Sequence, residues 1–290
     1  FASLRYFEQI SKHKAQSLIQ LKQEAQQLNT MLEQSVQAVV GIQEFAEYIL
    51  KHPNEVNTPM PSLLQQGNTF YLNKPQHDVI QQGRRLSSNI TGVGDVSQFT
   101  KQQKKELAMA NALTPVFISA QNIIVEATWF YYLSFNDFVN IYPWVDREIW
   151  QYSENTLMSS HFKALRELSP NNNEVLWSAP YLDAAGSGMN SSVGTGVFHQ
   201  GQLLGAVVID VNLSKIHATI SELDSTEQGV ILDRMTTKVD MFFENKDNAE
   251  HELVTVKALK RMQFFSRLLQ QNAFMKCSDI AAALTAITKP

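Results

Sequence analysis

The chain has 290 residues, of which 44% are apolar and 18% are charged, and its formal net charge at pH 7 is −4. This composition is typical of a globular protein with a packed core and argues against disorder. The scattered lysines and arginines form no basic stripe of the kind that a nucleic-acid surface needs. A single cysteine, Cys277, excludes an internal disulfide and a cysteine-built zinc site.

The first 50 residues have the pattern of one long helix. No proline occurs before Pro53, and apolar residues recur at heptad spacing along two seams. One seam contains Leu4, Leu18, Ala25, Leu32, Val39 and Ala46, and the other contains Phe7, Leu21, Leu28, Ile42 and Ile49. Two interpretations stand side by side. The helix either dimerises and leaves a membrane at its N-terminal end, or it is a spine that packs on its own domain.

Prolines and glycines punctuate residues 51–97, which predicts loops, a short helix at 61–66 and a brief strand at 69–72. Helical spacing then returns from Lys101 to about Asn122.

The next segments are rich in β-branched and aromatic residues, which predicts strands. These strands are 123–134, 175–181, 192–199 and 203–211, the last two joined by a tight turn at Gln200-Gly201-Gln202. Residues 143–168 and 213–222 are predicted to be helical. The expected fold class is therefore α+β, with a long N-terminal helical spine and a largely antiparallel sheet.

Residues 223–290 have a weaker pattern, which we interpret as a smaller second module. It is predicted to hold strands at 229–232, 239–243 and 253–256 and helices at 257–271 and 278–287. The chain is accordingly divided into a spine, 1–50, a first module, 51–222, and a second module, 223–290.

Four motifs in the middle of the chain resemble the membrane-distal module of double Cache sensors, especially those of bacterial histidine kinases. The motifs are Trp129-Phe-Tyr-Tyr-Leu, Tyr142-Pro143-Trp144, Trp177-Ser-Ala-Pro-Tyr181-Leu-Asp183-Ala-Ala-Gly186 and Gly205-Ala-Val-Val-Ile-Asp210-Val. Their order and spacing match over about residues 122–213. The resemblance implies a PAS-like sheet in a membrane-distal module and a smaller, PAS-like membrane-proximal module. The last 70 or so residues are short for a full module of that kind.

The resemblance also implies a ligand site. Tyr181, Asp183 and Asp210 match positions that hold a ligand amine in the amino-acid-binding subset of the family. That subset places an Arg, followed closely by Trp and Tyr, before its Tyr-x-Asp. The nearest candidates here are Arg147, Trp150 and Tyr152, which are spaced differently and are separated from Tyr181 by a longer insert.

Tyr142, Trp144 and Tyr181 have side chains with an apolar body and a polar tip, which suits the wall of a pocket for a small solute. Two carboxylates, Asp183 and Asp210, favour a cation. Each residue also has a structural interpretation. Tyr142 and Trp144 can be core residues, Asp183 can form a turn, and Asp210 can bond to nearby backbone.

An enzyme is not indicated, because no zinc-protease, nucleophile-elbow, P-loop or dinucleotide motif occurs and the seven histidines are isolated in sequence. No cofactor and no metal are expected. The most favoured function is the small-molecule sensor of a two-component histidine kinase. The alternatives are the sensor of a chemoreceptor or diguanylate cyclase, or a structural stalk that binds nothing.

The resemblance and the start at Phe1 predict that the chain is the extracytoplasmic, periplasmic part of an inner-membrane protein, attached through flanking transmembrane helices. The expected partners are a small-molecule ligand, such as an amine, an amino acid or another metabolite, and a second copy in a weak homodimer. No run of about 18 apolar residues occurs within the chain itself.

Overall fold

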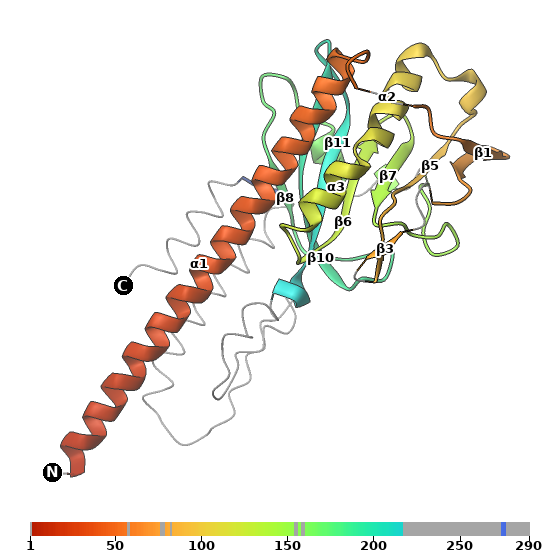
Figure 1. Ribbon diagram of the computed structural model, residues 1–290. Helices are drawn as coiled ribbons and strands as arrows, with labels where there is room; N and C mark the ends of the chain where they lie inside the picture. Colours follow the sequence, from red (N-terminus) through yellow and green to blue (C-terminus); the bar gives the residue numbers. More distant parts are fainter. Residues whose placement is uncertain are drawn as a thin grey trace.

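A computed structural model describes residues 2–56, 59–75, 79–81, 83–153, 156–157, 160–216 and 274–276. It has a long helix and an antiparallel sheet (Figure 1), so the predicted α+β class is confirmed. The helices are α1 (Ala2–Lys51), α2 (Lys101–Ala112), α3 (Thr114–Gln121) and α4 (Ser160–Leu165), with a 3₁₀ turn at Val96–Gln98. The strands that precede α2 are β1 (Leu63–Gln66), β2 (Thr69–Leu72), β3 (Ile80–Gln81), β4 (Arg84–Arg85) and β5 (Asn89–Val93). Those that follow it are β6 (Ala127–Ser134), β7 (Phe138–Tyr142), β8 (Leu176–Ser178), β9 (Tyr181–Leu182), β10 (Met189–His199), β11 (Gln202–Asn212) and β12 (Phe274–Lys276).

The main sheet has the order β1-β2-β5-β7-β6-β11-β10-β8-β12, with β9 beside β10, and β3 and β4 form a separate pair. Every pairing in the main sheet is antiparallel. The predicted pairing of 192–199 with 203–211 is confirmed, as Ser192 opposes Asp210. Gln200 and Gly201 both have positive φ, as the tightest hairpin turns require.

The sheet has two buried faces. The helix face packs against α1, α2 and α3, and its core includes Ile42, Leu107, Phe130, Tyr142 and Ile209. The opposite face, here called the outer face, is covered by described residues from Val145 to Leu168, including α4. Its core includes Tyr131, Val139, Tyr152, Leu165 and Val208. Because side chains alternate along a strand, odd and even residues of 129–133 in β6 and of 206–209 in β11 belong to different cores.

Helix α1 is unbroken past Leu32, as the heptad pattern predicts. Its second half packs on β10 and β11 through buried residues such as Val39, Ile42 and Ala46, which confirms the spine interpretation for this stretch. Glu47 adds a polar contact, because its Oε1 accepts a 3.0 Å hydrogen bond from the backbone N of Phe198. That amide lies at a β-bulge in the β10–β11 pairing, which frees it from the regular ladder.

Several predicted elements are wrong or shorter than expected. Residues 63–66 form strand β1 and not a helix. The expected helix 101–122 divides at Leu113, since Pro115 in the first turn of α3 cannot donate a backbone hydrogen bond to the preceding turn. Within 143–168 only α4 is an α-helix among the described residues. From Val145 onward, apolar residues at irregular spacing pack on the outer face, and this packing overrides helical propensity.

The C-terminal predictions fall almost wholly outside the described residues. Residues 213–216 are helical, and the rest of the predicted helix 213–222 lies outside. All the strands and helices predicted within 223–290 also lie outside. Residues 274–276, for which no element was predicted, form β12, which pairs with β8 at the sheet edge. None of the helices that the structure describes is long and apolar enough to cross a membrane.

Candidate functional site

The outer face carries a buried carboxylate near the end of β11. Asp210 is only 4% exposed, and its Oδ1 accepts hydrogen bonds from the Tyr131 hydroxyl at 3.0 Å and the Ser192 hydroxyl at 2.6 Å. Its Oδ2 accepts one from the Tyr181 hydroxyl at 2.7 Å. The Tyr181 and Ser192 hydroxyl oxygens are themselves 2.8 Å apart. Four strands therefore contribute to one buried polar cluster on the outer face, which consists of Tyr131, Tyr181, Ser192 and Asp210.

The strand register explains this convergence. Asp210 lies in β11 directly opposite Ser192 of β10 and opposite Trp129 of β6. Directly opposed residues point to the same face, as do residues two apart in one strand, so Trp129 and Tyr131 both stand on the side of Asp210. Tyr181 reaches the cluster from β9, which pairs with the start of β10.

A second carboxylate lies at the edge of this cluster. Asp183 Oδ2 accepts a hydrogen bond from the indole nitrogen of Trp129 at 3.0 Å and one from the backbone N of Ser187 at 2.9 Å. The second bond closes the turn between β9 and β10, which also contains Gly186 and Gly188 at positive φ. Asp183 is thus a turn-forming residue and at the same time a half-buried acid beside the buried Asp210.

Burial controls the protonation of the cluster. Desolvation raises the pKa of Asp210 from 3.8 to about 6, while hydrogen bonds from Ser192, Tyr181 and Tyr131 partly oppose this rise and the charge of Asp183 adds to it. Desolvation, followed by the charge of Asp210, raises the pKa of both tyrosines well above 10. Both phenols are therefore neutral donors at pH 7, and Asp210 is mainly an anion.

Helix α4 forms a wall next to this cluster. The Phe162 ring lies edge-on to the Tyr131 ring at 6.3 Å between centroids. Leu165 packs over Gly194, where an added Cβ would come within 3.3 Å of its Cδ1. Gly194 lies two residues beyond Ser192 on the same face of β10, so α4 covers the sheet immediately beside Asp210.

The structure brings together three of the seven predicted site residues, namely Tyr181, Asp183 and Asp210. The predicted grouping of Tyr142 and Trp144 with them is wrong. Tyr142 is fully buried in the helix-face core, opposite Phe130 in the register, and Trp144 packs against the same core. The alternation of side chains along β7 explains this position. Val139 and Ile141 point to the outer face, so the next residue, Tyr142, points to the helix face.

Arg147 and Trp150 lie apart from the acidic cluster. The Arg147 guanidinium donates to Gln66 Oε1 at 2.9 Å and stacks over the Tyr71 ring at 4.0 Å, so it belongs to the β1–β2 end of the sheet. Trp150 packs on the outer-face core without a hydrogen bond to Asp183 or Asp210 from its described atoms. Their role in ligand binding stays a prediction.

Sequence reasoning did not select Trp129, Tyr131 and Ser192 as site residues. A signal for the first two was present, because they are two residues apart in a strand and share a face. The register that places them opposite Asp210 has no equivalent signal in a single sequence.

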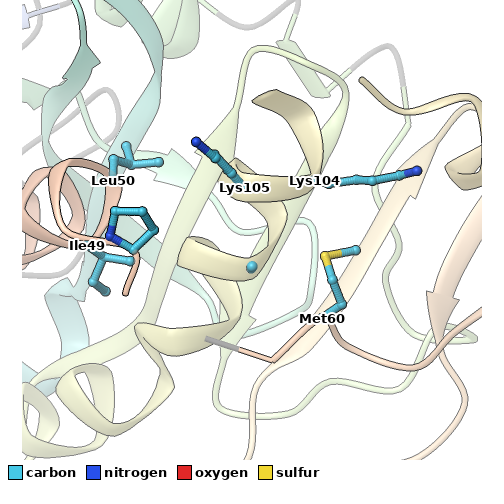
Figure 2. Close-up of a pocket in the computed structure, with 7 residues that line it drawn as sticks. Ile49, Leu50, Met60, Lys104 and Lys105 are labelled. Carbon is cyan, nitrogen blue, oxygen red and sulfur yellow. The ribbon is translucent and has the colours of Figure 1, made fainter. Parts of the chain in front are cut away.

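A hollow of about 220 Å³ lies elsewhere, between the end of α1 and α2 (Figure 2), and shares no residue with the acidic cluster. Its lining residues are Ile49, Leu50, Pro53, Met60, Lys104, Lys105 and Ala108. Across the part of the chain that the structure describes, no three His, Cys, Asp or Glu side chains are grouped as metal ligands.

No family model matches the chain, and no curated protein matches it. Among solved structures, the ligand-binding domain of the Pseudomonas aeruginosa PAO1 amino acid chemoreceptor PctC, in complex with GABA, is 15% identical with a TM-score of 0.40, over 72% of this chain and 68% of that one. That of the Campylobacter jejuni chemoreceptor Tlp3, with L-valine, is 10% identical with a TM-score of 0.36, over 72% and 64%. That of Pseudomonas fluorescens CtaA, with L-isoleucine, is 15% identical with a TM-score of 0.36, over 69% of this chain and 56% of that one. At these scores the likeness is limited, and the function proposed below depends on the residues of this chain.

Proposed function

We propose that the chain is the extracytoplasmic sensor domain of a bacterial transmembrane receptor, and that it binds a small molecule through a cationic nitrogen at Asp210. The observation that carries this proposal is a buried carboxylate without a cationic partner that lies next to a second carboxylate, Asp183, and to two half-buried aromatic residues, Trp129 and Tyr181. Neither Asp210 nor Asp183 forms an ion pair with any residue that the structure describes.

A buried anion without a counter-charge costs folding free energy, as the raised pKa of Asp210 records. Buried carboxylates are usually paired, and one that is held by neutral hydroxyls alone is a candidate for an exogenous cation. A carboxylate has about four acceptor positions, and the hydroxyls of Tyr131, Tyr181 and Ser192 use three at Asp210. One position is left for an N–H of the ligand.

The aromatic residues around Asp210 suit the same ligand. Trp129, Tyr131 and Tyr181 contact the two carboxylates through the polar groups at their ring edges, and their apolar ring bodies suit the walls of a site for a small organic ligand. Trp129 and Tyr181 are half-buried at the rim, whereas Asp210 lies at the floor. An alkyl-ammonium group would therefore reach Asp210 past Trp129 and Tyr181.

The receptor class is supported by the sequence motifs that resemble double Cache sensors. Their likeness to sensors of histidine kinases favours a two-component histidine kinase as the full-length protein, and a chemoreceptor or a diguanylate cyclase is the alternative. The coding sequence on both sides of this chain is the test. Membrane spans within a few dozen residues on each side, followed by a kinase domain, are expected. The absence of both spans would contradict the receptor assignment, whereas a different output domain would contradict only the histidine kinase.

Binding itself is tested by a thermal-shift screen of small metabolites against the purified domain. Compounds with a primary ammonium group should raise the melting temperature, and Asp210→Asn should abolish that rise. Glu106→Gln is the matched control. Glu106 is an equally buried carboxylate on the helix face, where Tyr132, Ser134 and Asn136 donate to it. Its replacement should leave ligand stabilisation unchanged.

A structural stalk is the second candidate, and the 50-residue length of α1 is the observation that favours it. In that case no solute stabilises the domain, and Asp210 contributes only to folding. A screen in which no compound shifts the melting temperature would favour the stalk.

A further inference from the structure

We infer that the ligand is an amine that carries no carboxylate group. This inference rests on the proposed function, since it names the chemical class that the site around Asp210 accepts. Three observations support it: the charge of the cluster, the positions of the nearby basic side chains, and the use already made of the hydrogen-bond donors.

The cluster contains one carboxylate, Asp210, and a second carboxylate, Asp183, lies at its edge. Asp183 and Asp210 are close enough for the charge of Asp183 to raise the pKa of Asp210. An amino acid that placed its ammonium group on Asp210 would also bring its own carboxylate into this negative region. Like charges in a partly desolvated site repel strongly, so a bound carboxylate needs a compensating cation.

The basic side chains that the structure describes in the covering segment do not supply that cation. Arg147 is bound to Gln66 and Tyr71 at the other end of the sheet. Arg166 of the turn after α4 lies over the Phe135 ring, at 5.2 Å, and is exposed. Lys163, on α4 itself, is also exposed.

The neutral donors of the cluster are already used. The hydroxyls of Tyr131, Tyr181 and Ser192 donate to Asp210. The Trp129 indole and the backbone N of Ser187 donate to Asp183. A ligand carboxylate would have to take one of these donors away from a protein carboxylate, which leaves a buried anion less satisfied than before. The cluster therefore offers acceptors to a ligand and withholds donors from it.

The experiment compares matched pairs that differ only in the carboxylate, by calorimetric titration of the whole 290-residue chain. Suitable pairs are isobutylamine with L-valine, tryptamine with L-tryptophan, and n-propylamine with GABA. At least one amine is expected to bind ten-fold or more tightly than its amino-acid partner. An amino acid that binds as tightly as its amine, or more tightly, would overturn the inference while leaving the proposed function standing.

Asp183→Asn tests the cause of the discrimination. The amide oxygen of asparagine can keep both hydrogen bonds that Asp183 Oδ2 accepts, so the turn is preserved while one negative charge is removed. The ratio of amine affinity to amino-acid affinity should fall several-fold in this variant and stay unchanged in Glu106→Gln. An unchanged ratio in Asp183→Asn would contradict the role of the second carboxylate. If no amine and no amino acid binds at all, the proposed function itself fails, which is a different result from a reversed preference.

Discussion

Replacing Asp210 with asparagine should stabilise the unliganded domain at neutral pH. The folded-state pKa of Asp210 is about 6 and the ordinary value is 3.8, a difference worth about 3 kcal/mol when the group is ionised in both states. Because the folded pKa is raised, the stabilising contribution of this group is fully present below about pH 3.8 and is lost as the pH rises through about 6. Asparagine is neutral throughout and avoids this loss.

The pH dependence separates this effect from the local cost of the substitution. Linkage gives a penalty for ionised Asp210 of about 3 kcal/mol at pH 7.5 and about 1 kcal/mol at pH 4.5. The advantage of Asp210→Asn over the wild type should therefore shrink by about 2 kcal/mol between these two pH values. Any fixed difference between the carboxyl and amide groups cancels in this comparison.

The assay is urea unfolding of both proteins at pH 7.5 and pH 4.5, with ligand titrations at pH 7.5. Ligand binding should weaken about 10–100-fold in the variant, because a charge-assisted hydrogen bond is lost. Two results would refute this reasoning and make Asp210 a structural hydrogen-bonding residue. In the first, the difference in unfolding free energy between the two proteins is the same at both pH values. In the second, the variant is less stable than the wild type and this deficit is larger at pH 7.5 than at pH 4.5.

Further predictions concern the same site, the sheet and assembly. Ligand affinity, measured by calorimetry, should fall as the pH drops below about 6, approaching ten-fold per pH unit, because a proton competes with the cation for Asp210. Tyr181→Phe removes a hydrogen bond that lowers the pKa of Asp210, so the midpoint of this pH profile should move upward; a downward shift would contradict the geometry. Gly205→Ala should destabilise the fold by about 1–3 kcal/mol in urea, since an added Cβ meets the backbone oxygen of Leu133 and lies 2.6 Å from the Tyr132 hydroxyl. Light scattering over a concentration series should show weak self-association, and a tight dimer whose interface avoids residues 1–50 would count against pairing through the long helix.

The parts of the fold that sequence reasoning predicted well are those with a long or redundant signal. The 50-residue heptad pattern predicted α1, and two β-branched runs around Gln200-Gly201 predicted the β10–β11 hairpin. Strands β5 and β7 were not predicted. Residues 89–93 contain a glycine, and 138–142 are separated from β6 by only three residues, so neither has a clear period of its own.

The candidate site was predicted in part for a similar reason. Tyr181, Asp183 and Asp210 were selected because they belong to motifs with a recognisable order, and the structure brings them together. Tyr142 belongs to such a motif too, but a shift of one residue moves a strand residue to the opposite face. The face to which Tyr142 points depends on the register between β7 and β6, and tertiary packing decides that register.

The attachment of α1 has a mechanical consequence. A 50-residue helix is about 75 Å long, and the first of its described side chains to be buried is Met31, so about 40 Å of helix extends N-terminally from the anchored part. Glu47, which contacts β10, is about 67 Å from the N-terminal end of the helix, so a rigid tilt of about 5° at this contact would displace that end by about 6 Å. The hairpin that anchors the lever is the same one that carries Ser192 and Asp210, so a rearrangement too small to disturb the sheet would be magnified several-fold at the N-terminus.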